Sequence, residues 1–418
     1  MNSIFWSLRH RGFRTLWSAM VIAGIAQWAM MVGRAWLVFE LSGSALAVAL
    51  ITFSGFFGTF VMVPLGGILA DRNDRKALLL ISLVAPMLTS LLLGAIVIAG
   101  SVTVWEVTLL ALADSLGRSM GQPASRAMTP SLVPQEDLLN AVSLRNAAMR
   151  GPRVFGPLLA APILASVGAQ GVFIGAAVLY GVATLTASGL PRTPLARAQG
   201  VTTTIAMEFR EGFRYITGVS PINIMVALVA THCALTMSFD SLLPGLAKDE
   251  LGGGSTLYSY LFMSVGAGGL IATLSIAALR DSGMRGAALL ISAVMSGGSL
   301  IVVALSSTPA AALAGLALAG GSQAGFMSLS EVLLLEFVPD RLRGRAMGVY
   351  TMNNAGMMAV FALVNGYFAD LWHLQGVFMV LGLAFVAVTI VTFALSGRLR
   401  WIYGSGQLGN GASETVTA

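Results

Sequence analysis

Long apolar runs, separated by short polar stretches, make up most of this chain. Residues 41–70 and 77–105 contain no charged side chain, and longer charge-free runs cover 154–191 and 286–330. About 20 apolar residues cross a bilayer as a helix, so each of the two longest runs holds two crossings and a tight turn. The runs lack the short alternation of apolar and polar positions that marks a membrane β-strand. The pattern therefore predicts a polytopic membrane protein built from α-helices.

We expect twelve crossings, because polar or Gly/Pro-containing turns divide the runs into segments long enough to span. The expected fold class is an all-α membrane protein with twelve transmembrane helices in two six-helix, pseudo-symmetric halves. The expected spans are 15–39, 44–70, 77–99, 103–125, 139–166, 171–190, 221–245, 256–279, 287–306, 309–335, 344–369 and 375–396.

The composition supports this class and orients the helices. Of the 418 residues 56% are hydrophobic and only 10% are charged, whereas a soluble protein carries about a quarter of its residues as Asp, Glu, Lys or Arg. Basic residues gather in the alternate loops of one side, and the opposite loops carry Lys248 alone. This bias marks the cytoplasmic face. Both termini are therefore expected inside, and the net charge of +6 reflects topology and no nucleic-acid partner.

An internal repeat supports the division into halves. Gln170–Phe173 recurs as Gln375–Phe378, and Val133-Pro134 recurs as Val338-Pro339, each 205 positions later. These matches join equivalent spans of the two halves, as expected for parallel repeats of a transporter.

The expected parts are a cytoplasmic N-terminus, a six-helix half, a cytoplasmic linker, a second six-helix half and a disordered cytoplasmic tail. Their bounds are 1–14, 15–190, 191–220, 221–396 and 397–418. Within the linker, Ile205, Phe209, Phe213 and Ile216 recur at helical spacing. This pattern predicts an amphipathic helix at the membrane surface, and a partner-binding helix is the open alternative.

The segment GGILADRNDRK at 66–76 places five charges between two apolar runs. It resembles the loop between spans 2 and 3 of the major facilitator superfamily, in a form similar to bacterial exporters that include enterobactin and macrolide exporters. Trp36–Ser44 and Arg153–Pro157 agree with that branch. The resemblance implies a gating loop that contacts span 11 and holds the transporter closed inside. Its residues would be Gly67, Asp71, Arg72, Asp74 and Arg75; simple positive-inside anchoring is the alternative.

Span 5 contains two Gly-Pro steps, Gly151-Pro152 and Gly156-Pro157. Proline removes a helix hydrogen bond, so both steps are expected to let the helix flex. The sequence GPLLAA resembles the antiporter signature of span 5, although alanines stand where glycines are usual.

Ionisable residues inside spans are costly and mark solute pathways. Asp114 and Arg118 lie one helical turn apart in span 4 and should share a face. The expected substrate-cavity residues are Gln27, Arg34, Asp114, Arg118, Asn146, Arg150, Arg153 and Gln323. Arginines outnumber acids among the deeper positions, so an anionic or partly anionic solute is expected. Arg34 could instead reach the membrane interface.

No phosphate-binding loop supplies ATP drive, so exchange with protons is expected. Asp114 is the first candidate to carry the proton, because Arg118 should hold it ionised and a substrate that competes for Arg118 would favour its protonation. Asp240 and Glu331 are further candidates.

The leading hypothesis is a proton-driven exporter of small amphipathic molecules, siderophore-like or drug-like, that works by alternating access. We expect a monomer in the bacterial cytoplasmic (inner) membrane, with the lipid bilayer, the small-molecule substrate and protons as partners. Import or facilitated diffusion of a metabolite is the open alternative. A membrane-embedded enzyme or a sensor is a remote one, since three His and one Cys form no catalytic or metal cluster. No cofactor or metal is expected.

Overall fold

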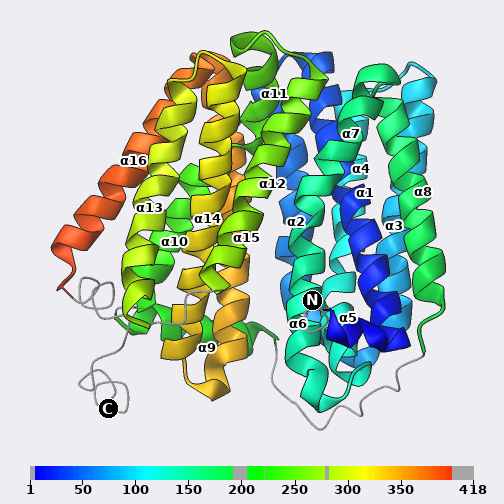
Figure 1. Cartoon of the computed structure of the whole chain (residues 1–418), viewed down its shortest axis with the longest axis vertical. Helices are drawn as coiled ribbons and strands as arrows, with labels where there is room; N and C mark the ends of the chain where they lie inside the picture. Colours follow the sequence, from blue (N-terminus) through cyan, green and yellow to red (C-terminus); the bar gives the residue numbers. More distant parts are fainter. Residues whose placement is uncertain (1–4, 192–204, 221, 278–281, 398–418) are drawn as a thin grey trace. The chain divides into compact units, whose positions relative to one another are not determined.

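The computed structural model describes residues 5–191, 205–220, 222–277 and 282–397. Within these ranges, the side chains of 63–64, 66–72, 205–206, 208, 277 and 282–285 lie outside the description. All regular elements of the described residues are helices (Figure 1). The chain forms two compact units, Met1–Thr202 with Gly253–Met263, and Thr203–Gly252 with Ser264–Ala418.

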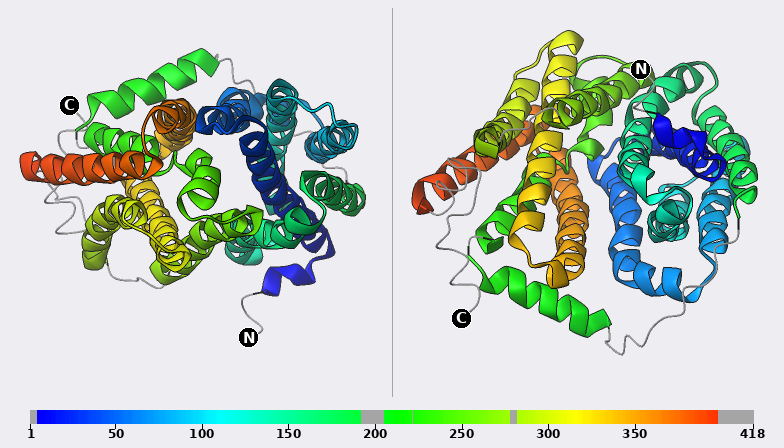
Figure 2. Two further views of the ribbon diagram at one scale, coloured as in Figure 1. Left: turned by 90° about the horizontal axis from the view of Figure 1, so that it is seen from above. Right: turned by 60° about the horizontal axis from the view of Figure 1, so that its bottom comes forward.

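The first unit is built from eight long or medium helices and three short 3-10 turns among its described residues. They are η1 (Trp6–Arg9), α1 (Arg11–Ser42), α2 (Ala45–Arg72), α3 (Arg75–Ile98), α4 (Val104–Ser119), α5 (Gly121–Met128), η2 (Thr129–Ser131), η3 (Gln135–Asp137), α6 (Leu138–Arg150), α7 (Pro152–Ser166) and α8 (Ala169–Ser188). Helix α1 packs against α7 and α8, and α2 packs against α4 (Figure 2).

The second unit has the same kind of architecture. Its elements are α9 (Ile205–Gly218), α10 (Ile222–Thr236), η4 (Asp240–Leu242), α11 (Leu243–Gly245), η5 (Leu246–Glu250), α13 (Ser282–Ala304), α14 (Pro309–Phe337), η6 (Asp340–Leu342), α15 (Arg343–Leu371) and α16 (Leu374–Leu395). Helix α12 (Ser255–Ala277) belongs to both units, because residues up to Met263 group with the first.

Ten of the twelve expected spans coincide with helical segments that are long and apolar enough to cross a membrane, counted over the described residues. The other two, expected at 103–125 and 139–166, are also helical, but each is broken into two shorter helices. The fourth span changes from α4 to α5 at Met120, and the fifth changes from α6 to α7 at Gly151. The all-helical fold class is therefore confirmed. These two spans are not single helices, and the seventh is also interrupted, because α10 ends at Thr236 before η4 begins at Asp240.

The repeat found in the sequence is present in the helices. Val104 and Pro309 start α4 and α14, Leu138 and Arg343 start α6 and α15, and Ala169 and Leu374 start α8 and α16. The members of each pair stand 205 positions apart, the offset of the repeated tetrapeptide. The offset thus relates whole helices and not only short motifs.

Glycines allow the closest helix contacts in each unit. A Cβ on Gly58 of α2 would lie 2.3 Å from Ser115 Oγ of α4, and one on Gly320 of α14 would lie 1.9 Å from the carbonyl oxygen of Val265 in α12. Real Cβ atoms do not approach this closely, so larger residues would force the helices apart. Small residues at helix crossings are the usual basis of tight packing in membranes.

Helix α9, which was expected at the membrane surface, packs on the second unit. Ile216 is buried in the core of this unit, and Phe209 packs against the same cluster. Glu211 forms ion pairs with Arg345, at the start of α15, and with Arg341. The apolar side that carries Phe209 and Ile216 is therefore covered by protein, while Phe213 is exposed.

Candidate functional site

Among the described residues of the first unit, three charged side chains from two helices form a largely buried, ion-paired cluster. Arg34 Nη1 of α1 donates a hydrogen bond of 3.1 Å to Asp114 Oδ2 of α4, and both side chains are 7% exposed. Arg118 Nε, one turn further along α4, lies 3.8 Å from the same oxygen. The expected pair of Asp114 and Arg118 is present, but the closer partner of Asp114 comes from another helix.

The charges of this cluster do not cancel. Two guanidiniums and one carboxylate leave one positive charge, and Nε and Nη2 of Arg34 make no hydrogen bond. At about 4 Å and an effective dielectric constant of about 20, two unit charges interact by about 4 kcal/mol. The cluster therefore holds α1 and α4 together and leaves a site that attracts an anion.

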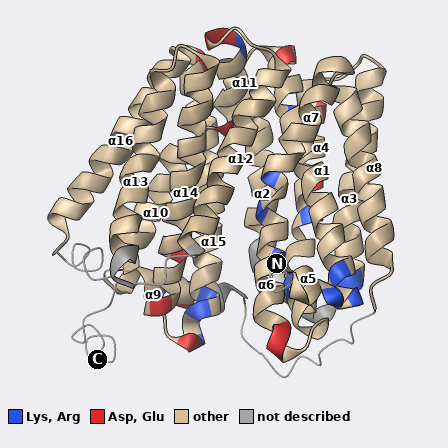
Figure 3. Ribbon diagram, viewed as in Figure 1, with Lys and Arg blue, Asp and Glu red and all other residues tan. Residues whose placement is uncertain are grey.

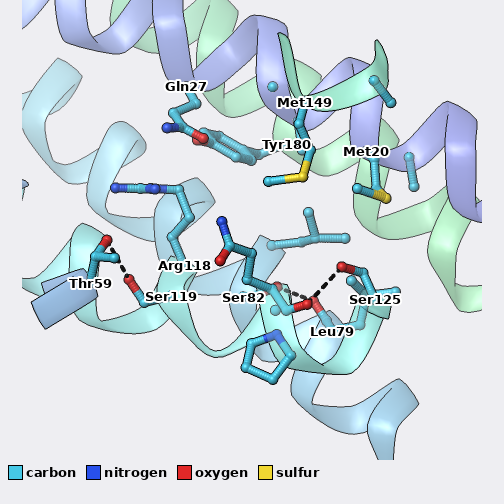
Figure 4. A pocket seen from close by; sticks show the side chains of 18 of the residues that line it. Met20, Gln27, Thr59, Leu79, Ser82, Arg118, Ser119, Ser125, Met149 and Tyr180 are labelled. Atoms are coloured by element: carbon cyan, nitrogen blue, oxygen red, sulfur yellow. Dashed lines mark hydrogen bonds between the residues drawn. The ribbon is translucent and has the colours of Figure 1, made fainter. Parts of the chain in front are cut away.

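A cavity of about 300 Å³ lies within the first unit, next to this cluster. Figure 4 shows Gln27, Arg118 and Tyr180 around it, with Met20 and Met149 forming an apolar wall. The lining comes from α1 to α6 and α8. Helix α3 contributes Leu79, Ser82 and Leu83 to the lining, and α8 contributes Tyr180.

Several polar groups of the lining are satisfied by backbone carbonyls. The hydroxyls of Ser82, Ser119 and Ser125 each donate to a carbonyl three or four residues earlier in the chain. Thr59 and Ser119 exchange a hydrogen bond of 3.4 Å. Of the described residues that line the cavity, Arg118 is the one that carries a charge.

The structure separates the expected cavity residues into three groups. Gln27 and Arg118 line the cavity, and Arg34 and Asp114 lie in the ion-paired cluster beside it. Arg34 is buried against its partner Asp114.

The remaining expected cavity residues lie elsewhere. Asn146 and Arg150 of α6 are exposed. The guanidinium of Arg153 stacks on Trp28 at 5.1 Å and on Phe262 at 5.8 Å. Gln323 is 3% exposed and donates to the carbonyl oxygen of Thr236 in the second unit. None of these four lines the first-unit cavity.

The other candidate proton carriers lie in the second unit. Asp240 is buried in η4, and Glu331 of α14 is partly buried. His232 Nε2 of α10 donates a 2.9 Å hydrogen bond to the Ser296 hydroxyl, which in turn donates to the Thr236 hydroxyl. Phe326 and Phe385 pack on the imidazole ring. The surroundings of His232 are thus hydroxyls and aromatic rings, in contrast to the charged cluster of the first unit.

The expected gating loop is described in part. Asp74 caps the N-terminus of α3 by accepting a 2.9 Å hydrogen bond from the backbone N–H of Lys76. Arg75 donates to the carbonyl oxygen of Ala127 at 3.2 Å. The side chains of Gly67, Asp71 and Arg72 lie outside the described residues, so their expected contact with span 11 stays a prediction.

The two Gly-Pro steps of the fifth span differ. Pro152 begins α7, so the helix is interrupted at the first step, whereas α7 is continuous through Gly156 and Pro157. A Cβ on Gly156 would lie 2.5 Å from Trp28 Cβ, which shows close packing of α7 on α1. Flexing of these steps during transport stays a prediction.

Sequence reasoning missed a polar clamp at the start of the chain. Asp137 Oδ2 accepts from Arg9 Nη2 at 2.8 Å and lies 2.7 Å from His10 Nε2, while Ser7 Oγ donates to the Asp137 carbonyl at 3.1 Å. Phe13 is fully buried beneath it. The hydrogen bond with His10, followed by that with Arg9, lowers the pKa of the Asp137 carboxyl against the opposing effect of burial. No sequence motif signals this contact between segments about 130 positions apart.

Charge is distributed unevenly along the helices. In Figure 3, most charged residues of the first unit lie toward the end that carries α5 and the start of α6.

Among the residues that the structure describes, no group of three or more His, Cys, Asp or Glu could hold a metal ion.

Comparison with known proteins identifies the family. Residues 2–400 match the family described as transmembrane secretion effectors. The chain belongs to this family of the major facilitator superfamily. The resemblance noted in the loop after span 2 is therefore confirmed, and with it the expectation of a membrane transporter.

Relatives and solved structures agree. Macrolide efflux protein A of Streptococcus pyogenes is 23% identical, over 92% of this chain and 95% of the relative. Enterobactin exporter EntS of Salmonella typhimurium is 27% identical, over 96% and 97%. The crystal structure of a D-xylose-proton symporter matches with a TM-score of 0.75 at 16% identity, over 97% of this chain and 100% of that one. The nucleoside transporter NupG matches with a TM-score of 0.69 at 15% identity, over 91% and 98%. The two structures share the fold.

Proposed function

We propose that this chain is a proton-coupled exporter of small amphipathic molecules that works by alternating access. It acts as a monomer in the cytoplasmic membrane of a bacterium, with both termini inside and without an enzymatic step. The observation that carries the proposal is Asp114, a buried carboxylate held between two guanidiniums beside a cavity. Relatives named as an efflux protein and an exporter support the outward direction, and the basic loops support the orientation.

A proton on Asp114 changes the forces between two helices. The ionised carboxylate attracts Arg34 of α1 and Arg118 of α4. The neutral acid leaves two guanidiniums that repel each other. Because Arg34 has no other hydrogen-bond partner for Nε and Nη2, protonation favours a different packing of α1 against α4. A proton can thus shift the balance between two conformations, as proton-driven alternating access requires.

Limited access of water to Asp114 lets the proton and the solute occupy the site in turn. Asp114 is 7% exposed, and Arg118, its neighbour, lines the cavity. A molecule in the cavity covers Arg118 and separates the carboxylate from water on that side. In this proposal a filled cavity closes the path of the proton to Asp114, and this occlusion outweighs the preference of an anion for the protonated cluster. Proton and solute then occupy the site in turn, which gives exchange.

The test is transport by purified protein in liposomes with an imposed pH gradient. Internal pH is followed with a trapped dye while a panel of siderophores, drugs and organic anions is offered in counterflow. Protons should move against the solute. The Asp114→Asn protein should keep solute exchange but lose its response to the pH gradient, and Asp249→Asn, at an exposed acid, should behave like the wild type. An undiminished pH-gradient response in Asp114→Asn would remove Asp114 from this role.

A further inference from the structure

The first-unit cavity combines one charge with apolar walls. Arg118 supplies the charge, Gln27 and Gln122 supply amides, and Met20 and Met149 supply flexible apolar surface. Ligand pockets are typically of this kind, mostly apolar with a few placed polar groups. Methionine side chains adapt to ligands of different shape. The lining therefore suits a molecule with an apolar body and a single acid group.

The two arginines of the cluster have different tasks. Arg34 is the close partner of Asp114 at 3.1 Å and does not line the cavity. Arg118 lies at 3.8 Å, its Nε makes no hydrogen bond, and its side chain is 25% exposed. Arg34 can therefore hold Asp114 alone, and the guanidinium of Arg118 remains for a ligand. The geometry corrects the simpler expectation that Arg118 is the main partner of Asp114.

We propose that this cavity binds a small amphipathic monoanion, whose acid group pairs with Arg118 and whose apolar body lies against Met20 and Met149. This rests on the proposed function as a transporter and names the substrate class of its site. Arg34, Asp114 and Arg118 together leave one positive charge, so one negative charge on the ligand makes the occupied site neutral. A second negative charge would be buried without a partner, and the guanidinium of Arg118 would repel a cation.

The size of the cavity limits the ligand. About 300 Å³ is the lower end of the range for pockets that hold drug-sized molecules, about 300–1,000 Å³. A two-ring aromatic acid matches this size and chemistry, because its rings can lie between the methionines and the ring of Tyr180 (Figure 4).

Binding to the full chain in lipid nanodiscs tests the proposal without a gradient. The probes are 1-naphthoate, 1-naphthylmethylammonium and the neutral 1-naphthylmethanol, titrated by calorimetry, with empty nanodiscs as the control for partition into lipid. We expect naphthoate to bind at least about tenfold more tightly than the other two, which corresponds to one charge-assisted pair. Equal or tighter binding of the ammonium or the alcohol overturns the proposal. Absence of binding by all three at millimolar concentration overturns it too, because the proposal specifies charge and size.

Matched variants locate the interaction. Arg118→Gln should weaken naphthoate by about 10- to 100-fold and leave the alcohol unchanged, since a hydrogen bond to a charged group is lost. Arg126→Gln removes an exposed arginine that does not line the cavity and should leave both unchanged. Unaltered naphthoate affinity in Arg118→Gln contradicts the assignment. The three-probe comparison on the wild type remains decisive if that variant does not fold.

The outcomes separate this inference from the proposed function. Charge-selective binding that depends on Arg118, without solute export in liposomes, supports the site and refutes the exporter. Proton-coupled export without preference for the anion supports the exporter and refutes the site.

Discussion

The fourth and fifth spans of the first unit differ from their repeats in the second, although they begin 205 positions apart. Helix α14 runs from Pro309 to Phe337 and α15 from Arg343 to Leu371 without a break, whereas α4 gives way to α5 and α6 to α7. Arg118 stands just before the first break and Arg150 just before the second. Broken helices in transporters mark places where backbone and side chains face a site. Of these two pairs of equivalent spans, the members in the first unit are broken and those in the second are continuous; the second unit has its own interruption in the seventh span, where α10 ends at Thr236 before η4 begins at Asp240.

The side chains at equivalent positions show the same difference. Arg118 corresponds at this offset to Gln323, Asp114 to Ala319 and Arg34 to Phe239. The first set forms a charged cluster beside a cavity, while Gln323 is buried and bonded to the backbone. At these three pairs of positions, the charged side chains belong to the first unit and their equivalents in the second unit are uncharged.

Of the substitutions that test this difference between the units, removal of Arg34 should have the largest effect on stability and transport. Arg34→Gln leaves Asp114 with the longer contact to Arg118 alone, and breaking one side of a buried ion pair costs about 3–5 kcal/mol. We expect the free energy of unfolding to fall by about that amount and pH-driven transport to be lost. Denaturant titration of the purified protein measures the first effect, and the liposome assay measures the second.

The double variant Arg34→Gln, Asp114→Asn provides the control. It removes the uncompensated carboxylate, so most of the lost stability should return while proton coupling stays absent. If Arg34→Gln alone is as stable as the wild type, Arg34 is not the principal partner of Asp114.

Gln323 stands at the position equivalent to Arg118 and should affect the stability of the protein but not the binding of naphthoate. Thr236 is the last residue of α10, and its carbonyl has no partner within the helix. Gln323→Leu removes the amide that donates to this oxygen, at a cost of about 1–3 kcal/mol for an unsatisfied buried acceptor. Melting experiments should show this loss, while naphthoate affinity stays at the wild-type value. A loss of naphthoate affinity would show that the neutral half also contributes to the site.

Sequence patterns predicted the helices well, because each apolar run is a local property. Ten expected spans coincide with segments long and apolar enough to cross a membrane within the described residues, although the seventh is interrupted after Thr236. The breaks at Met120 and Gly151 depend on packing, and only the second carries a Gly-Pro signal. The repeat offset, read from a few short matches, relates whole helices.

The candidate site was predictable only where its members are close in sequence. Asp114 and Arg118 are four positions apart, so helical spacing alone places them on one face. Arg34 is 80 positions away, and its pairing depends on how α1 packs on α4. Asn146, Arg150 and Arg153 recur at helical spacing, which suggested a shared face. The packing of the helices decides which of them are exposed, and Asn146 and Arg150 are.

The break between α6 and α7 can be tested by giving the first unit the residue that the second unit has at the equivalent position. Pro152 corresponds to Met357 at the offset of 205, so Pro152→Met gives the first unit the residue found in the continuous helix. Proline at the first position of α7 costs little stability, because its missing N–H would have no helical partner. We expect a change of no more than about 1 kcal/mol, with a slower turnover and an unchanged affinity for naphthoate. Faster or unaltered turnover would show that the break is not used in transport.

Pro157 offers a matched control for this prediction. It lies inside α7, which is continuous around it. Pro157→Met should leave turnover closer to the wild type than Pro152→Met does. The comparison separates the effect of the break from the general effect of removing a proline.

The smallest expected effect concerns the clamp at Asp137, which corresponds to the apolar Leu342 in the second unit. Its hydrogen bonds with His10 and then Arg9 lower the pKa of the carboxyl below the ordinary value of 3.8. A lowered folded-state pKa means that the stabilisation is complete above about pH 4 and is lost as pH falls through the folded-state pKa. Asp137→Asn should therefore melt below the wild type at pH 7, and the difference should shrink as pH falls below 3.8. In the His10→Ala background, which lacks the first donor, the fall in melting temperature caused by Asp137→Asn should be smaller at every pH. A difference between wild type and Asp137→Asn that persists unchanged to pH 3 would assign the effect to packing and not to the charge of Asp137.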